Sequence, residues 1–284
     1  MSRSSTPPTK RAVLERPGCR LYYEVTGAGP AIVFAHGLGG NHLSWWQQVP
    51  HFAGRHTCVT FAHRGFAPSS EIAGGPDPAD YAGDLAALID HLALDHVFLV
   101  AQSMGGWACL DYALAQPRRV FALVLASTAG AIERRSTLLR DPGSLDAWIA
   151  RAAAARAEMA RQAIHPAAGS RMAREQPALH FLYRSIDAMA GANFDKEGLR
   201  ARMIKLQTRS PDVLKTLAVP TLFITAEEDV VFPPLLAGPL AAAMPHARVE
   251  QVVAAGHSAY FERAEIFNRL VAEFFATVGA AAAA

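Results

Sequence analysis

Three residues of the sequence, Ser103, Asp229 and His257, have the types needed for nucleophilic attack on a carbonyl carbon. A serine hydroxyl becomes reactive when a base removes its proton, and an imidazole serves as that base when a carboxylate orients it. Ser103 stands in AQSMGG at 101–106, between an apolar run at 97–100 and the start of a helix. Because serine is also a favoured helix N-cap, the hexapeptide alone indicates a cap. The downstream acid and base favour a nucleophile.

The neighbours of Ser103 are small, as a tight turn between a strand and a helix requires. Ala101 and Gly105 lie two positions to either side, and Gly106 follows. Small side chains at these positions let two backbones approach closely, so the hydroxyl can be presented at a sharp turn.

Attack on a carbonyl creates an oxyanion, which two main-chain N–H groups can stabilise. The Met104 N–H lies at the start of the helix after Ser103, where the helix dipole also favours an anion. The segment 36–40 (HGLGG) follows another apolar run and can supply the second donor. We expect the Leu38 N–H in this role.

The elements that must position these groups alternate between strand and helix. Strands are expected at 21–25, 31–35, 57–62, 97–101, 120–126, 220–225 and 248–253, and helices at 80–94, 104–116 and 260–275. Near-continuous apolar strands predict a mostly parallel sheet with helices on both faces, an α/β fold. Since Ser103, Asp229 and His257 each follow a strand, we expect them at the same edge of the sheet.

Residues 130–212 interrupt this alternation, because they are rich in Ala and Arg and contain no convincing strand. We therefore predict a core formed by 17–129 and 213–278 and a helical cap at 130–212. Loose tails are expected at 1–16 and 279–284.

The composition narrows the class of protein. Of 284 residues, 51% are hydrophobic and 18% charged, and the formal net charge of +2 gives no general attraction to nucleic acid. The three cysteines form no C-x-x-C pair, which fits a reducing compartment. Without an apolar leader or a long apolar span, a cytoplasmic protein that does not enter membranes is expected.

Five motifs together resemble those of the α/β-hydrolase family. They are AHGLGG (35–40), HRGFAPSS (63–70), AQSMGG (101–106), TAEEDVVFPP (225–234) and AAGHSAYFE (254–262), and the resemblance covers about residues 20–278. It implies a serine hydrolase with Ser103 as nucleophile, Asp229 as acid and His257 as base, without a cofactor or a metal. The sequence departs from the family pattern at Ala101, Ala62, Ala67 and Ala226.

Several residues compete for these roles. Glu227 and Glu228 are alternatives to Asp229, although the spacing of the family motif to Pro233 fits Asp229. His36 is expected to be structural, and His63, His91 and His96 are expected at the surface or in loops. Cys109 is expected to fill the core.

The resemblance leaves the substrate open, and a carboxylic ester or a lactone is the first choice. A carbon–carbon bond hydrolase acting on ring-cleavage diketones is the alternative; its relatives often carry Trp after the histidine, where this chain has Ser258. A cofactor-free perhydrolase has no distinctive mark here. Serine at the turn argues against the dehalogenases and epoxide hydrolases of the family.

Two alternatives come from other classes. Dinucleotide binding is disfavoured because the third glycine of G-x-G-x-x-G would fall on His42 and no acid follows the next strand. A non-catalytic ligand-binding protein of the same fold would not need the complete triad. The partner expected is a small molecule. The sequence leaves the oligomeric state open, with a homodimer among the arrangements allowed.

The expected cap is also basic, with 14 Lys and Arg against 8 Asp and Glu in residues 131–210. Most of these cations fit solvated outer helix faces. The sharper hypothesis is that one or two point inward and hold a substrate carboxylate. Arg184 is the first candidate and Arg202 the second, with Trp148, Phe181 and Tyr183 as apolar lining.

Overall fold

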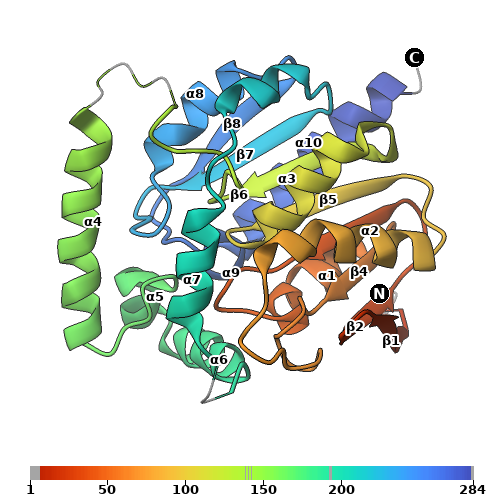
Figure 1. Cartoon of the computed structure of the whole chain (residues 1–284), viewed down its shortest axis with the longest axis horizontal. Coiled ribbons are helices and arrows are strands. Elements are labelled where there is room, and N and C mark those ends of the chain that lie inside the picture. The colour runs from red at the N-terminus through yellow and green to blue at the C-terminus, as the bar shows by residue number, and fades with distance from the viewer. Residues whose placement is uncertain (1–6, 138, 140, 142, 192–193, 283–284) are drawn as a thin grey trace, which may run out of the picture.

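The computed structural model describes residues 7–137, 139, 141, 143–191 and 194–282. Its centre is an eight-stranded sheet with the order β1-β2-β4-β3-β5-β6-β7-β8 (Figure 1). The strands are β1 (Thr9–Arg16), β2 (Cys19–Thr26), β3 (Ala31–Ala35), β4 (Thr57–Phe61), β5 (Val97–Gln102), β6 (Val120–Ala126), β7 (Thr221–Ala226) and β8 (Ala247–Val252).

The sheet is mostly parallel, as predicted. The β1–β2 and β2–β4 pairs are antiparallel, and all pairs from β4 through β3 to β8 are parallel. In register, Ala35 lies opposite Ala101, and Gln102 lies opposite Ala126. The carboxyl ends of β3, β5 and β6 are therefore level, and the loops that follow them share one edge.

Helices cover both faces of the sheet. Successive residues of a strand point to opposite sides, so the apolar strands present side chains to both layers of helices. Val33 and Leu99 belong to one buried cluster, with residues of α2 (Tyr81–His91), α3 (Gly105–Ala115) and α8 (Ala237–Ala242). Phe34 and Val100 belong to the other, with residues of α1 (Gln48–Phe52), α9 (Ala259–Glu262) and α10 (Ala264–Ala282). The predicted doubly covered α/β sheet is confirmed.

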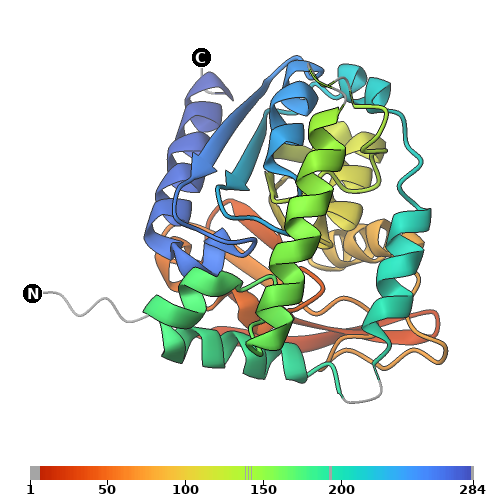
Figure 2. The same ribbon diagram turned by 90° about the vertical axis from the view of Figure 1, so that its left-hand side faces the viewer.

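Four α-helices lie between β6 and β7 in the described part of the chain, and we call them the inserted helices. They are α4 (Gly143–Arg161), α5 (Gly169–Glu175), α6 (Pro177–Ala188) and α7 (Lys196–Lys205). Figures 1 and 2 show them together, in green to teal, on one side of the molecule. The helical character expected for this stretch is therefore observed.

Both predicted tails contain regular structure, so the prediction of loose ends at 9–16 and 279–282 is wrong. Thr9–Arg16 forms β1, whose register runs from Thr9 opposite Thr26 to Arg16 opposite Cys19. Main-chain pairing with an edge strand needs little apolar surface, so a polar sequence gave no signal. At the other end α10 continues to Ala282, as the high helix propensity of alanine allows.

No helix in the described part of the chain combines the length and the apolar character needed to cross a membrane.

Candidate active site

Ser103 occupies a strained turn between β5 and α3. Its φ is +50°, a left-handed conformation that costs a non-glycine residue free energy and recurs at functional turns. The Ser103 N–H donates to the Ala126 carbonyl at 3.0 Å, which ties the turn to the end of β6. A side chain on Gly105 would meet the Ala35 carbonyl oxygen at 2.2 Å, so glycine is required for α3 to start against β3.

Asp229 and His257 form a buried pair at the same edge of the sheet. His257 Nδ1 lies 2.8 Å from Asp229 Oδ2, and both side chains are almost inaccessible to solvent. The other carboxylate oxygen, Oδ1, accepts the N–H groups of Val231 at 2.7 Å and Phe232 at 2.8 Å. These bonds fix the carboxylate, which in turn holds a proton on Nδ1 and leaves Nε2 to act as a base.

The neighbouring acids have other partners. Glu227 Oε2 accepts the Ala254 N–H at 2.8 Å. Glu228 forms an ion pair with Arg171 near the surface. Of the three acids weighed in the sequence, Asp229 is the one that the fold places against His257.

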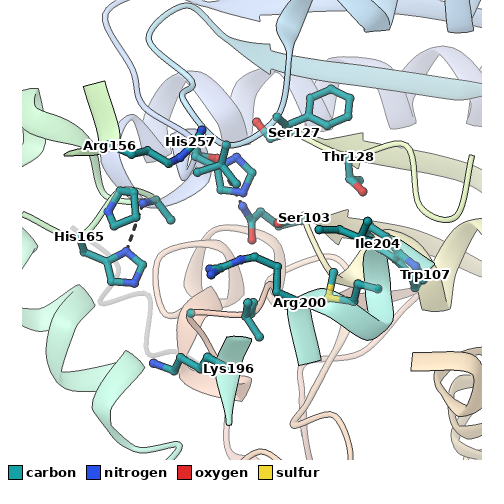
Figure 3. Close-up of a pocket in the computed structure, with 18 of the residues that line it drawn as sticks. Ser103, Trp107, Ser127, Thr128, Arg156, His165, Lys196, Arg200, Ile204 and His257 are labelled. Atoms are coloured by element: carbon teal, nitrogen blue, oxygen red, sulfur yellow. Dashed lines mark hydrogen bonds between the residues drawn. The ribbon is translucent and has the colours of Figure 1, made fainter. Parts of the chain in front are cut away.

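Ser103 and His257 line one cavity of about 480 Å³ (Figure 3). Among the described residues no hydrogen bond joins the Ser103 hydroxyl to His257. Such bonds are often long in unliganded enzymes and tighten in the substrate complex. The arrangement can therefore deliver the serine proton to the imidazole once a ligand fills the cavity.

The loop that holds Leu38 is anchored by His36. His36 Nε2 accepts the His63 N–H at 3.0 Å, so its Nδ1 carries the proton and donates to the Gly37 carbonyl at 2.8 Å. Burial lowers the pKa of His36 well below its usual value, which keeps this ring neutral. His36 is thus part of the loop architecture, as expected.

Leu38 lines the cavity, and Met104 is the N-cap of α3. Neither the Leu38 N–H nor the Met104 N–H donates to any other group in the described part of the chain. Two donors without protein partners beside a candidate nucleophile are the arrangement that an oxyanion requires. Their role as an oxyanion hole remains a prediction.

The predicted substrate residues divide into two groups. Trp148 and Tyr183 line the cavity. Phe181 does not, because it is 74% exposed, and Arg184 is exposed on the same helix, α6. Consecutive residues of a helix point about 100° apart, so Arg184 turns away from the face that buries Tyr183.

Arg202 also lies outside the cavity. Its Nε donates to the Pro76 carbonyl at 3.1 Å, so the side chain packs against the loop before α2. The proposed inward orientation of Arg184 and Arg202 is therefore wrong. His63 lies in the loop after β4 but is fully buried there, while His91 and His96 are exposed and Cys109 is in the core as expected.

Sequence reasoning missed several residues of the cavity wall. They are Ser127 and Thr128 after β6, His165 and Asp187, and the cations Arg134, Arg156, Lys196 and Arg200. The positive charge of residues 131–210 was a signal for the cations as a group. The charge could not show which cations line the cavity, because the direction of each side chain depends on how its segment packs against the sheet.

His165 is a half-buried imidazole beside Asp187 and Tyr183. Its Nε2 lies 3.7 Å from Asp187 Oδ2, and its ring lies 5.2 Å from that of Tyr183. Burial lowers the pKa of His165 to about 4, against the opposing effect of Asp187. His165 is therefore neutral near pH 7.

Comparison with known proteins places the chain among hydrolases. The family model for the alpha/beta hydrolase fold matches residues 30–264. A protein of Mycobacterium tuberculosis named "Putative non-heme bromoperoxidase BpoC" is 30% identical over 273 residues, covering 92% of this chain and 99% of that protein. Its crystal structure has a TM-score of 0.69 and covers 91% of this chain and 96% of the other.

Two further similar proteins are named for other activities. "Putative carbamate hydrolase RutD" of Variovorax paradoxus is 30% identical over 280 residues, covering 92% of this chain and 97% of that protein. A thermophilic esterase from Thermogutta terrifontis, solved with malate bound, has a TM-score of 0.74 at 24% identity and covers 95% of this chain and 99% of the other. The latter similarity establishes the fold alone.

Proposed function

The chain belongs to the alpha/beta-hydrolase family, and we propose that it is a serine hydrolase that cleaves carboxylic esters or lactones. The observation that carries the proposal is the buried 2.8 Å contact between His257 and Asp229 at the wall of the cavity that also holds Ser103. The strained φ of Ser103 supports it, because such a conformation persists where the surrounding structure enforces it.

The proposed reaction begins when Ser103 Oγ bonds to the acyl carbon and its proton passes to His257 Nε2. The Leu38 and Met104 N–H groups donate to the resulting oxyanion. When the intermediate collapses, the bond to the leaving oxygen breaks and His257 returns the proton to that oxygen. An acyl-enzyme on Ser103 remains.

Water then repeats the sequence on the acyl-enzyme. His257 takes a proton from the water as its oxygen bonds to the acyl carbon, and the proton returns to Ser103 Oγ when the acid leaves. Asp229 keeps the imidazole oriented throughout and stabilises its charged form. The chain supplies every group in this scheme, and water is the second substrate.

The inserted helices would act as a cap in this scheme. Trp148 of α4, Tyr183 of α6 and Met203 of α7 all line the cavity that holds Ser103. A cavity of about 480 Å³ suits a small-molecule substrate. The names of two relatives, a bromoperoxidase and a carbamate hydrolase, add two further reactions to be tested.

The test is a substrate panel assayed with the wild-type protein and with Ser103→Ala. The panel contains activated esters, lactones, a carbamate, a vinylogous diketone, and acetate with hydrogen peroxide and bromide. We expect ester or lactone hydrolysis in the wild type and a loss of about 10⁴- to 10⁶-fold in kcat for Ser103→Ala, since the catalytic groups act as a unit.

An organophosphonate should also add once per chain, on Ser103. Unchanged turnover in Ser103→Ala, or an adduct on another residue, would show that the proposed nucleophile is wrong. A protein that binds the panel but turns over none of it would instead be a ligand-binding member of the family. Turnover confined to the diketone would support carbon–carbon bond hydrolysis.

A further inference from the structure

The cavity beside Ser103 is strongly cationic. Arg134, Arg156, Lys196 and Arg200 line it, and Asp187 is the single carboxylate among its described lining residues. Two of the cations are paired. Lys196 Nζ lies 2.6 Å from Asp187 Oδ1, and Arg200 forms an ion pair with Glu197 on the same helix. The remaining two, Arg134 and Arg156, pair with no carboxylate among the described residues, so their charge is available to a ligand.

Arg134 is unpaired among the residues that the structure describes. Within the described residues its guanidinium takes part in no ion pair and no hydrogen bond, and its contact is with the Phe232 ring, 5.4 Å from the ring centroid. Burial lowers the pKa of Arg134, and nearby Asp229 opposes that effect. The guanidinium remains charged, since the ordinary pKa of arginine exceeds 12.

Asp229 does not act as the partner of Arg134. One of its oxygens faces His257, and the other accepts the N–H groups of Val231 and Phe232. The guanidinium is half-buried at the cavity wall, and none of the described residues uses its N–H groups. An anion that enters the cavity can therefore accept hydrogen bonds from it.

Arg156 approaches the same loop from α4. Its guanidinium donates to the Val230 carbonyl, and no carboxylate among the described residues pairs with it. Arg134 contacts Phe232 and Arg156 contacts Val230, so the two arginines flank residues 230–232, which follow the acid Asp229. Val231 and Phe232 also line the cavity. Figure 3 shows Arg156 and Ser103 around the same pocket.

We infer that Arg134, with Arg156 beside the same loop, binds a free carboxylate on the substrate. The inference rests on the proposed function, because the site lies in the cavity that holds Ser103. The substrate class is then an ester or lactone that carries a carboxylate away from the bond to be cleaved, such as a monoester of a dicarboxylic acid. Arginine suits this task because its planar fork matches a carboxylate with two parallel hydrogen bonds.

The test compares two substrates that share one leaving group, 4-nitrophenyl hydrogen glutarate and its methyl ester, in which a methyl group removes the charge of the distal carboxylate; release of 4-nitrophenol is followed for both. We expect the wild type to prefer the carboxylate in kcat/KM. Arg134→Gln should reduce this preference by about 10- to 150-fold, the range for a hydrogen-bonded charge pair. The ratio of the two kcat/KM values is measured because general damage to the site lowers both.

Three further variants extend the comparison. Arg134→Lys keeps the charge without the fork and should retain part of the preference. Arg135→Gln is the matched control, since Arg135 is the next residue, is exposed and pairs with Asp146 at the surface. It should keep the wild-type ratio. Arg156→Gln should lower the ratio less than Arg134→Gln.

The outcomes separate this inference from the proposed function. If the wild type hydrolyses both esters without preferring the carboxylate, or if Arg134→Gln keeps the preference, the proposed carboxylate site is wrong. The proposed hydrolase activity is supported in both cases. If neither ester is cleaved and no phosphonate adds to Ser103, the proposed hydrolase activity is wrong. Calorimetry with glutarate then tests the site alone: binding lost in Arg134→Gln supports it, and absence of binding in the wild type overturns it.

Discussion

At the scale of single residues, the assignment of the acid is the sharpest claim. Asp229→Asn should lower kcat by about 10⁴-fold with little change in fold, because an amide oriented toward Nδ1 stabilises the wrong tautomer of His257. The comparison variant is Glu228→Gln, whose wild-type side chain pairs with Arg171 near the surface. Steady-state kinetics of both variants on the best ester of the panel provides the measurement.

The reverse ranking, with Glu228→Gln inactive and Asp229→Asn active, would move the acid to the neighbouring residue. A similar loss in both would mean that the loop as a whole, and not one carboxylate, supports catalysis.

Residue types and strand ends predicted that Ser103, His257 and one acid of 227–229 lie together, because side chains after parallel strands converge. The choice of Asp229 among the three acids came from the spacing of the family motif. The cavity arginines could not be predicted in the same way. Arg134 lies in a loop, and its neighbour Arg135 has the same type but faces solvent. The sequence does not show which of the two arginines faces the cavity, since the direction of each side chain is set by packing between segments far apart in the chain.

At the scale of elements, the turn from β5 to α3 depends on close contact with β3. Gly105→Ala would place a Cβ 2.2 Å from the Ala35 carbonyl oxygen, where both partners are backbone and cannot rotate away. We expect a loss of several kcal/mol in the free energy of unfolding, together with loss of activity, as for other strained overpacked sites. Chemical denaturation monitored by circular dichroism measures the first effect.

Gly279→Ala is the matched control, since Gly279 lies in α10 and a Cβ added there would have no neighbouring atom within 4 Å. Alanine in a helix is favoured over glycine by about 0.5–1 kcal/mol, so this variant should keep or gain stability. Equal stability of Gly105→Ala and the wild type would show that β3 and α3 can separate at little cost.

Helix α7 explains why apolar periodicity missed part of the cavity wall. Its cavity side is formed by Lys196, Arg200, Met203 and Ile204, with Gln207 just beyond its end. The spacing is helical, but most of these residues are polar, and a polar stripe in a sequence indicates solvent. A cavity face and a solvent face thus have the same pattern, and the position of the helix over the sheet distinguishes them.

At the scale of the whole molecule, buried neutral histidines link stability to pH. Burial lowers the pKa of His63 to about 3, of His165 to about 4, and of His36 well below its usual value. In the unfolded chain an imidazole titrates near pH 6.5. Between about pH 6.5 and these lower values the unfolded state binds more protons, so stability falls as the pH falls.

His63 allows this linkage to be tested at one residue. Its ring is fully buried against the rings of Phe61, Tyr81 and His36, and neither ring nitrogen has a hydrogen-bond partner in the described part of the chain. Between pH 8 and pH 4.5 this histidine binds a proton in the unfolded chain but not in the native state, which should lower the free energy of unfolding by roughly 2–3 kcal/mol. His63→Phe preserves the ring packing and removes the proton-binding site, so its free energy of unfolding should fall less over this range by that amount.

Urea denaturation at a series of pH values measures the slope of stability against pH for His63→Phe and the wild type. The slope remains informative even if the larger ring shifts the absolute stability, because that shift is the same at every pH. His63→Leu is the smaller replacement, and the exposed His96, changed to Gln, controls for loss of an imidazole as such. If His63→Phe and His63→Leu both keep the wild-type slope, proton uptake at His63 does not drive the acid sensitivity of this fold.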